Sequence, residues 1–120
     1  MSSILEPKSK WPGIRSETVQ VRRLDGLWPE LMGGIDSPRV LLKMDTQGFD
    51  LNVFAGASGC LSSIACLQSE LSIVPLYEQM PHYLDALRTY EAAGFRLYNM
   101  AVVSRTPQGS LQELNCMMVR

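Results

Sequence analysis

Three polar side chains alternate where an apolar run of the sequence ends, and their types suit acid–base chemistry: Lys43, Asp45 and Gln47. Residues two apart on a strand point to one face, so Lys43 and Asp45 are expected together, with Gln47 just beyond. A carboxylate here can orient or deprotonate a hydroxyl group, and Asp45 is the best candidate for that role. Glu70, near the end of the next predicted strand, could approach the same crevice. The alternative is that these groups form a turn, cap a helix or lie on the surface.

A strand, a turn and a helix are predicted around Asp45. Residues 40–44 are a nearly continuous apolar run, which is typical of a parallel strand covered on both faces. After Gly48, Leu51, Phe54 and Ala55 recur at helical spacing. Ligands of open α/β sheets bind beyond the carboxyl ends of the strands, so these polar side chains lie where chemistry is expected.

The remaining segments predict an α/β fold with an antiparallel addition. Residues 1–17 form an arm or loop, and residues 18–120 form the domain, in which residues 18–24 alternate like a half-buried strand. Further helices are predicted at 26–32, with Asp25 as its cap, at 50–60 and at 81–93. Further strands are predicted at 64–73, 95–103 and 111–119, the last two as an antiparallel hairpin.

Composition excludes several classes of protein. The chain has 120 residues, 46% of them hydrophobic and 19% charged, which is ordinary for one globular domain. A net charge of −1 gives no basic surface for nucleic acid, and no apolar run approaches the roughly 20 residues of a membrane span. Three cysteines without C-x-x-C spacing are expected to be reduced thiols. We therefore expect a cytoplasmic protein that binds neither nucleic acid nor membrane.

Residues 42–57 read LKMDTQGFDLNVFAGA, and this segment resembles the signature of the FkbM family of S-adenosylmethionine-dependent methyltransferases. Members of that family have Lys-x-Asp-x-Glu-Gly, then Phe or Ala, an acidic residue, an apolar helix and a Gly-Ala pair. Arg23–Leu27 resembles the family's preceding Leu-Asp element. Leu67–Glu70 resembles its next strand, and Cys116–Arg120 its closing strand. The resemblance extends from about Thr18 to the last residue.

The resemblance implies both a fold and an activity. The fold would be the carboxyl-terminal half of a class I, Rossmann-like methyltransferase sheet, with parallel strands and a terminal antiparallel hairpin. S-adenosylmethionine would be the cofactor of the complete domain. The acceptor would be a hydroxyl group of a small metabolite, a sugar or a polyketide.

The same resemblance assigns roles to individual residues. Asp45 is the candidate for contact with the cofactor. Gln47 stands where the family has Glu, and because Gln is not a base and binds cations more weakly than a carboxylate, we expect no metal site. The catalytic candidates are Asp45, Lys43, Gln47 and Glu70. Tyr77 and His82 are the candidates for contact with the substrate, the alternatives being a packed ring and a solvated imidazole.

A Gly-rich cofactor turn is missing from the sequence. No G-x-G-x-x-G follows an apolar strand, and the Gly pairs at 33–34 and around 56–59 follow helical patterns, as helix ends do. The sequence thus predicts a fragment that lacks the amino-terminal half of the domain. Its central strand would have an unpaired edge, which favours self-association or pairing with the missing half. The alternative is a noncatalytic remnant or interaction module.

Overall fold

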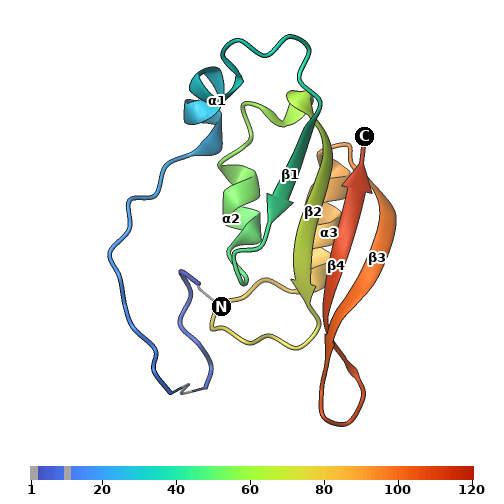
Figure 1. Ribbon diagram of the computed structural model, residues 1–120. Helices are drawn as coiled ribbons and strands as arrows, with labels where there is room; N and C mark the ends of the chain where they lie inside the picture. The colour runs from blue at the N-terminus through green and yellow to red at the C-terminus, as the bar shows by residue number, and fades with distance from the viewer. Residues whose placement is uncertain (1–2, 10–11) are drawn as a thin grey trace.

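Four strands form one mixed sheet in the computed structural model, which describes residues 3–9 and 12–120 (Figure 1). The strand order is β1-β2-β4-β3. Strands β1 and β2 are parallel, whereas β4 is antiparallel to both of its neighbours. The bounds are Val40–Met44 for β1, Ile64–Ser72 for β2, Arg96–Arg105 for β3 and Leu111–Val119 for β4. The predicted α/β fold with a terminal antiparallel hairpin of strands is confirmed.

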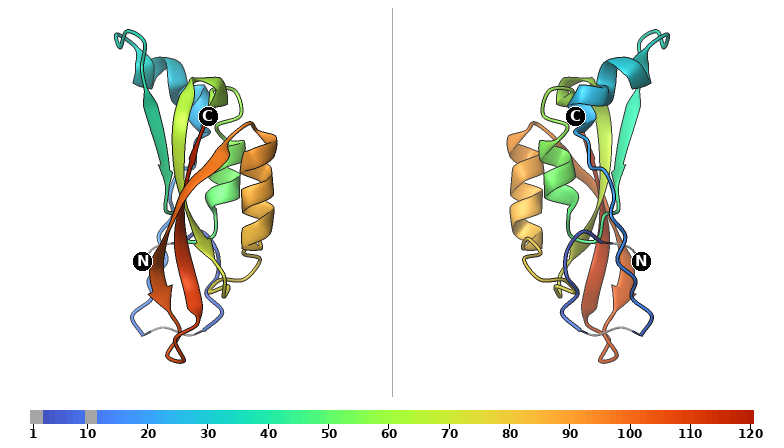
Figure 2. Two further views of the ribbon diagram at one scale, coloured as in Figure 1. Left: turned by 90° about the vertical axis from the view of Figure 1, so that its right-hand side faces the viewer. Right: turned by 90° about the vertical axis from the view of Figure 1, so that its left-hand side faces the viewer.

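Two helices, α2 (Asp50–Ala55) and α3 (Tyr83–Ala92), lie against one face of this sheet, as Figure 2 shows, and no described helix covers the other face. The other described helix is α1 (Leu24–Met32), with a short 3-10 turn η1 (Leu61–Ser63) before β2. Helix α2 was expected to run to residue 60, but turns replace it after Ala55. In the described part of the chain, no helix is both long and apolar enough to cross a membrane.

Two expectations about the segment before β1 are wrong. Residues 18–24 do not form a strand, because no described strand pairs with them in a hydrogen-bonded ladder, and Val19 and Val21 are 61% and 66% exposed. The N-cap of α1 is Arg23 and not Asp25. Asp25 lies in the first turn, where it pairs with Arg23 at 2.6 Å and accepts a hydrogen bond from the Gly59 N–H at 3.2 Å. Asp25 thus attaches α1 to the turns after α2.

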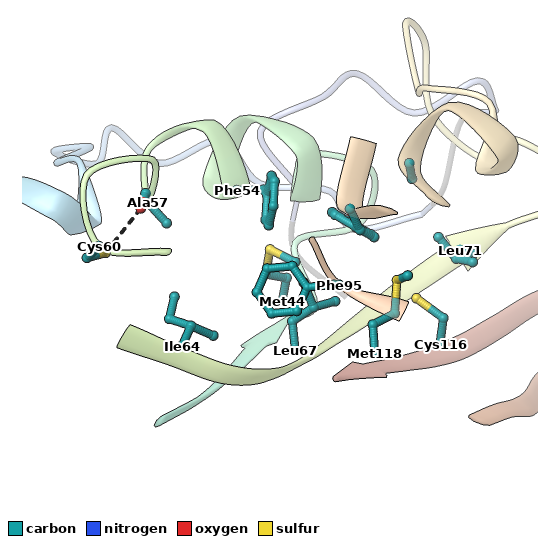
Figure 3. Close-up of a cluster of buried hydrophobic side chains, with 12 residues drawn as sticks. Met44, Phe54, Ala57, Cys60, Ile64, Leu67, Leu71, Phe95, Cys116 and Met118 are labelled. Atoms are coloured by element: carbon teal, nitrogen blue, oxygen red, sulfur yellow. Dashed lines mark hydrogen bonds between the residues drawn. The ribbon is translucent and has the colours of Figure 1, made fainter. Parts of the chain in front are cut away.

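The core lies between the sheet and the helices (Figure 3). Alternate residues of each strand point to this side, so Leu67 of β2 and Met118 of β4 are fully buried. Phe54 of α2 meets Tyr90 of α3 edge to face, with ring centroids 4.9 Å apart. The cysteines Cys60, Cys66 and Cys116 are free thiols, and two of them are buried as small apolar side chains.

The opposite side of the sheet, called here the helix-free face, has polar side chains beside apolar ones such as Leu41 and Met117. Its residues alternate with the core residues along each strand, and on it Glu70 is paired with Asn115 and Ser72 with Glu113. Such alternation is typical of antiparallel sheets that keep one face towards water. The face includes Lys43, Gln68, Glu70, Ser72, Asn99, Glu113 and Asn115.

Strand β1 departs from the expectation that both of its faces are covered. Leu41 is 53% exposed, because the helices cover only the side to which Met44 points. No described strand pairs with the outer edge of β1. The chain exposes 7951 Å² in all, whereas a folded monomer of 13.4 kDa is expected to expose about 6,500 Å². Exposed apolar side chains that contribute to this surface include Leu41 of β1 and Val19 and Val21 of the extended segment before α1.

Gly48, in the turn between β1 and α2, is predicted to tolerate substitution less than Gly109 in the hairpin turn. Both have positive φ, at 94° and 87°, which disfavours any side chain. A Cβ on Gly48 would also lie 2.9 Å from Met80 Cγ, whereas a Cβ on Gly109 would meet nothing within 4 Å. We expect Gly48→Ala to lower the free energy of unfolding in urea by about 1 kcal/mol more than Gly109→Ala does. Equal losses would show that Met80 moves aside without cost.

Candidate functional site

Gln47 follows the carboxyl end of β1 and lies between two carboxylates, Asp45 directly after β1 and Glu70 near the carboxyl end of β2. Its Nε2 donates to Glu70 Oε2 at 2.6 Å and to Asp45 Oδ1 at 3.4 Å. The Tyr77 hydroxyl donates to Gln47 Oε1 at 3.5 Å. Gln47 is buried and has a φ of 52°, in the left-handed region that non-glycine residues rarely adopt. The structure therefore brings four of the predicted site residues together, and Gln47 is the residue that joins them.

Asp45 is paired with Lys43, the fifth residue of this group. Lys43 Nζ lies 2.7 Å from Asp45 Oδ2, and both side chains are about half exposed. The hydrogen bond from Lys43 lowers the pKa of Asp45, against the smaller effect of partial burial. Asp45 is therefore a negatively charged acceptor at neutral pH and a weak base.

Glu70 has the opposite electrostatic character. Burial raises the pKa of Glu70, and the charges of Glu113 and Asp45 raise it further, although the hydrogen bond from Gln47 opposes them. A carboxyl group whose pKa is closer to neutral is a better proton acceptor than an ordinary one. The structure thus favours Glu70 over Asp45 as a base, whereas the sequence pattern pointed first to Asp45.

Asp50 is a buried acid that the sequence interpretation did not assign to the site. Its carboxylate accepts hydrogen bonds from the Thr46 N–H at 2.9 Å, the Ser69 hydroxyl at 2.7 Å and the Glu70 N–H at 3.2 Å, and from the Thr46 hydroxyl. Ser69 Oγ also lies 2.9 Å from the Tyr90 hydroxyl. The available signal was the acidic position of the signature, which begins α2 directly after Gly48 and Phe49.

Tyr77 and His82 occupy different surroundings. Tyr77 is buried, and its pKa is raised by burial first and then by the charges of Glu113 and Glu70. His82 is the exposed N-cap of α3, where its Nδ1 accepts a hydrogen bond from the Leu84 N–H at 3.3 Å. Its ring lies 4.5 Å from that of Tyr83. No hydrogen bond in the described part of the chain connects His82 with Gln47 or the carboxylates.

Glu113 of β4 is a second acid that the sequence interpretation did not assign. It is 4% exposed, and its Oε2 accepts a hydrogen bond from the Ser104 hydroxyl at 2.7 Å. Among the described residues, Glu113 Oε1 and the Ser72 hydroxyl have no hydrogen-bond partner. The sequence signal was an acidic residue on the polar face of a predicted strand, which is ordinarily a solvated position.

The chain was compared with protein families, with curated proteins and with solved structures. Residues 3–97 match the model of the methyltransferase FkbM domain. The match spans β1, α2, β2 and α3 and therefore includes the Gln47 group, whereas Glu113 lies beyond it. No curated protein and no solved structure matched. Among the described residues, no three His, Cys, Asp or Glu side chains come together as metal ligands would.

Asp50→Asn is predicted to destabilise the fold strongly. The substitution removes the charge that the turn after β1 and strand β2 both bind, and it places an N–H₂ group against donors, so we expect a loss of about 2–4 kcal/mol in the free energy of unfolding. Asp85→Asn is the matched control, because Asp85 is exposed and makes only a surface ion pair with Arg88 at 3.4 Å. Its loss should be less than about 1 kcal/mol. Urea unfolding of both variants measures the difference, and similar losses would contradict the role of Asp50.

Glu70 is predicted to make the protein less stable as the pH rises. Its pKa in the folded state lies above the ordinary value of 4.5, so the folded state keeps a proton that the unfolded state has released. Stability therefore falls as the pH rises from about 4.5 through the folded pKa, and this part of the fall should vanish in Glu70→Gln. Urea unfolding at about pH 5 and pH 7 tests this, with the exposed Glu30→Gln as the control. The same pH dependence in wild type and Glu70→Gln would contradict the assignment.

Proposed function

The chain belongs to the methyltransferase FkbM domain family, and from this premise we propose that it acts as an S-adenosylmethionine-dependent O-methyltransferase on a hydroxyl group of a small metabolite, sugar or polyketide. The observation that carries the proposal is the bridge by Gln47 between Asp45 and Glu70. This bridge joins the end of β1 to the carboxyl-terminal part of the parallel strand β2, and open α/β sheets bind their ligands at the carboxyl ends of their strands.

The residues of the site fit one side of the cofactor. S-adenosylmethionine, when bound, supplies a methyl group on a positively charged sulfur. Asp45 is charged and half exposed, so its carboxylate would contact the positive end of the cofactor. Lys43 would hold Asp45 in place. The sequence has no Gly-rich turn, so in this proposal these residues form one wall of the cofactor site.

The acceptor would be activated by Glu70. Methyl transfer is an in-line displacement, so the protein must hold the hydroxyl oxygen close to the methyl group and remove its proton. The raised pKa of Glu70 suits it to take that proton, and Gln47 fixes the carboxylate through a 2.6 Å hydrogen bond. Tyr77 would contact the acceptor from beside Glu70, and His82 would contact it from the start of α3.

The fold supports a partner for β1. In this proposal the sheet is the carboxyl-terminal half of a Rossmann-like methyltransferase sheet, with residues 1–17 as an arm and 18–120 as the partial domain. The outer edge of β1, unpaired among the described strands, would receive a parallel strand from an amino-terminal half or from a second copy of the chain. The free thiols Cys60, Cys66 and Cys116 suit a reducing cytoplasm.

A second candidate function is a noncatalytic interaction module. The exposed area of 7951 Å², against about 6,500 Å² expected for this mass, favours a chain that buries surface against another protein. In this case the uncovered edge of β1 would serve for association alone, and the Gln47 group would be structural. The two candidates differ in whether the chain binds the cofactor product.

Calorimetric titration of the purified chain with S-adenosylhomocysteine tests the choice between them. A methyltransferase site should show saturable one-site binding. In a parallel titration with S-adenosylmethionine, whose sulfur is positively charged, Asp45→Asn should weaken binding about tenfold or more through loss of a charged contact. Asp36→Asn is the control, because Asp36 is exposed in a turn before β1. Absence of binding by the wild-type chain would favour the interaction module. Equal affinities of wild type and Asp45→Asn would remove Asp45 from the cofactor site.

A further inference from the structure

The helix-free face contains a buried carboxylate oxygen that lacks a donor. Glu113 is 4% exposed, and while its Oε2 is bound by Ser104, its Oε1 has no partner in the described part of the chain. Ser72, paired with Glu113 across β2 and β4, is 5% exposed, and its hydroxyl likewise has none there. Leaving a charged oxygen buried without a donor is unfavourable, so a ligand that donates hydrogen bonds would be stabilised here.

A second carboxylate on the same face increases the negative charge. Glu70 is paired with Asn115 and Glu113 with Ser72, so the two glutamates are diagonal neighbours, for which a separation of about 7 Å is typical. The charge of Glu113 contributes to the raised pKa of Glu70, after burial, which agrees with this proximity. The ammonium group of Lys43 is paired with Asp45 at 2.7 Å, and its weaker interaction with Glu70 offsets only part of their charge. The charge of the pair therefore favours a cationic ligand.

A hollow beside the two glutamates is lined by carboxamides. It has a volume of about 140 Å³, and Gln68, Asn99 and Asn115 line it together with Ala101, Cys116 and Met117. Carboxamides both donate and accept hydrogen bonds, so they suit hydroxyl groups. Asn115 connects the hollow to the acids, because it is paired with Glu70 and lies two residues from Glu113 on the same face. Asn115 and Glu70 are half-buried, whereas Glu113 is buried.

We propose that this face binds a polyhydroxylated primary amine, such as an amino sugar, with its ammonium group at Glu113 and its hydroxyl groups against Glu70 and the carboxamides of the hollow. That this amine is the methyl acceptor rests on the function proposed above, whereas the amine site itself does not. The identification as the acceptor follows from Glu70, which belongs both to this site and to the Gln47 group.

The full 120-residue chain can be titrated with glucosamine and with glucose. Glucosamine has an amine where glucose has a hydroxyl group, and the pH is chosen so that this amine is protonated. Because a charge-assisted hydrogen bond distinguishes them, glucosamine should bind about tenfold more tightly or better. Glu113→Gln should remove this preference and leave glucose binding unchanged. Glu30→Gln, on the exposed side of α1, is the control and should keep the preference. Circular dichroism verifies that each variant is folded.

Several outcomes would overturn the proposal. The proposal is wrong if the wild-type chain binds glucosamine and glucose with equal affinity, and this result does not depend on whether Glu113→Gln folds. It is also wrong if Glu113→Gln keeps the preference for glucosamine. The cofactor also has an amino group, so S-adenosylhomocysteine is titrated in parallel. If Glu113→Gln weakened the binding of S-adenosylhomocysteine and not that of glucosamine, Glu113 would bind the amino group of the cofactor, and the proposed amine acceptor would be wrong. If the wild-type chain bound glucosamine but not S-adenosylhomocysteine, the proposed function would fail while the amine site stood.

Discussion

The buried carboxylate of Asp50 is the constraint on which the rest of the site depends. A charge in this position is tolerated only because Thr46, Ser69 and the Glu70 N–H all donate to it. These donors come from the turn after β1 and from β2, and Ser69 extends the network to Tyr90 of α3. Satisfying one buried acid therefore fixes the turn, the neighbouring strand and the covering helix relative to one another.

The position of Gln47 follows from this constraint. The turn between β1 and α2 places Gln47 and Gly48 at positive φ, and the Gln47 side chain then reaches both Asp45 and Glu70. The two carboxylates differ because Lys43 lowers the pKa of Asp45, whereas burial and neighbouring acids raise the pKa of Glu70. When the environments of two acids move their pKa values apart in this way, one acid can stay charged while the other exchanges a proton.

The two faces of the sheet divide stability from recognition. Strand residues such as Leu67 and Met118 point towards the helices and form the core. The opposite residues include Glu70 and Glu113 together with other polar side chains, so the helix-free face contributes charge and hydrogen-bonding groups. Strand β1 contributes to both faces, because its residues alternate between the core and an uncovered surface at the edge of the sheet.

The sequence by itself determined the features that depend on neighbouring residues. Periodicity located β1, β2 and the hairpin of β3 and β4, and the signature around Asp45 identified the family. The tertiary structure alone decided that residues 18–24 form no strand, because a strand requires a partner. It also decided that Asp50 and Glu113 are buried, and that Gln47 joins Asp45 to Glu70. These outcomes depend on contacts between distant segments, and desolvation of a carboxylate is set by those contacts and not by the residues beside it in the chain.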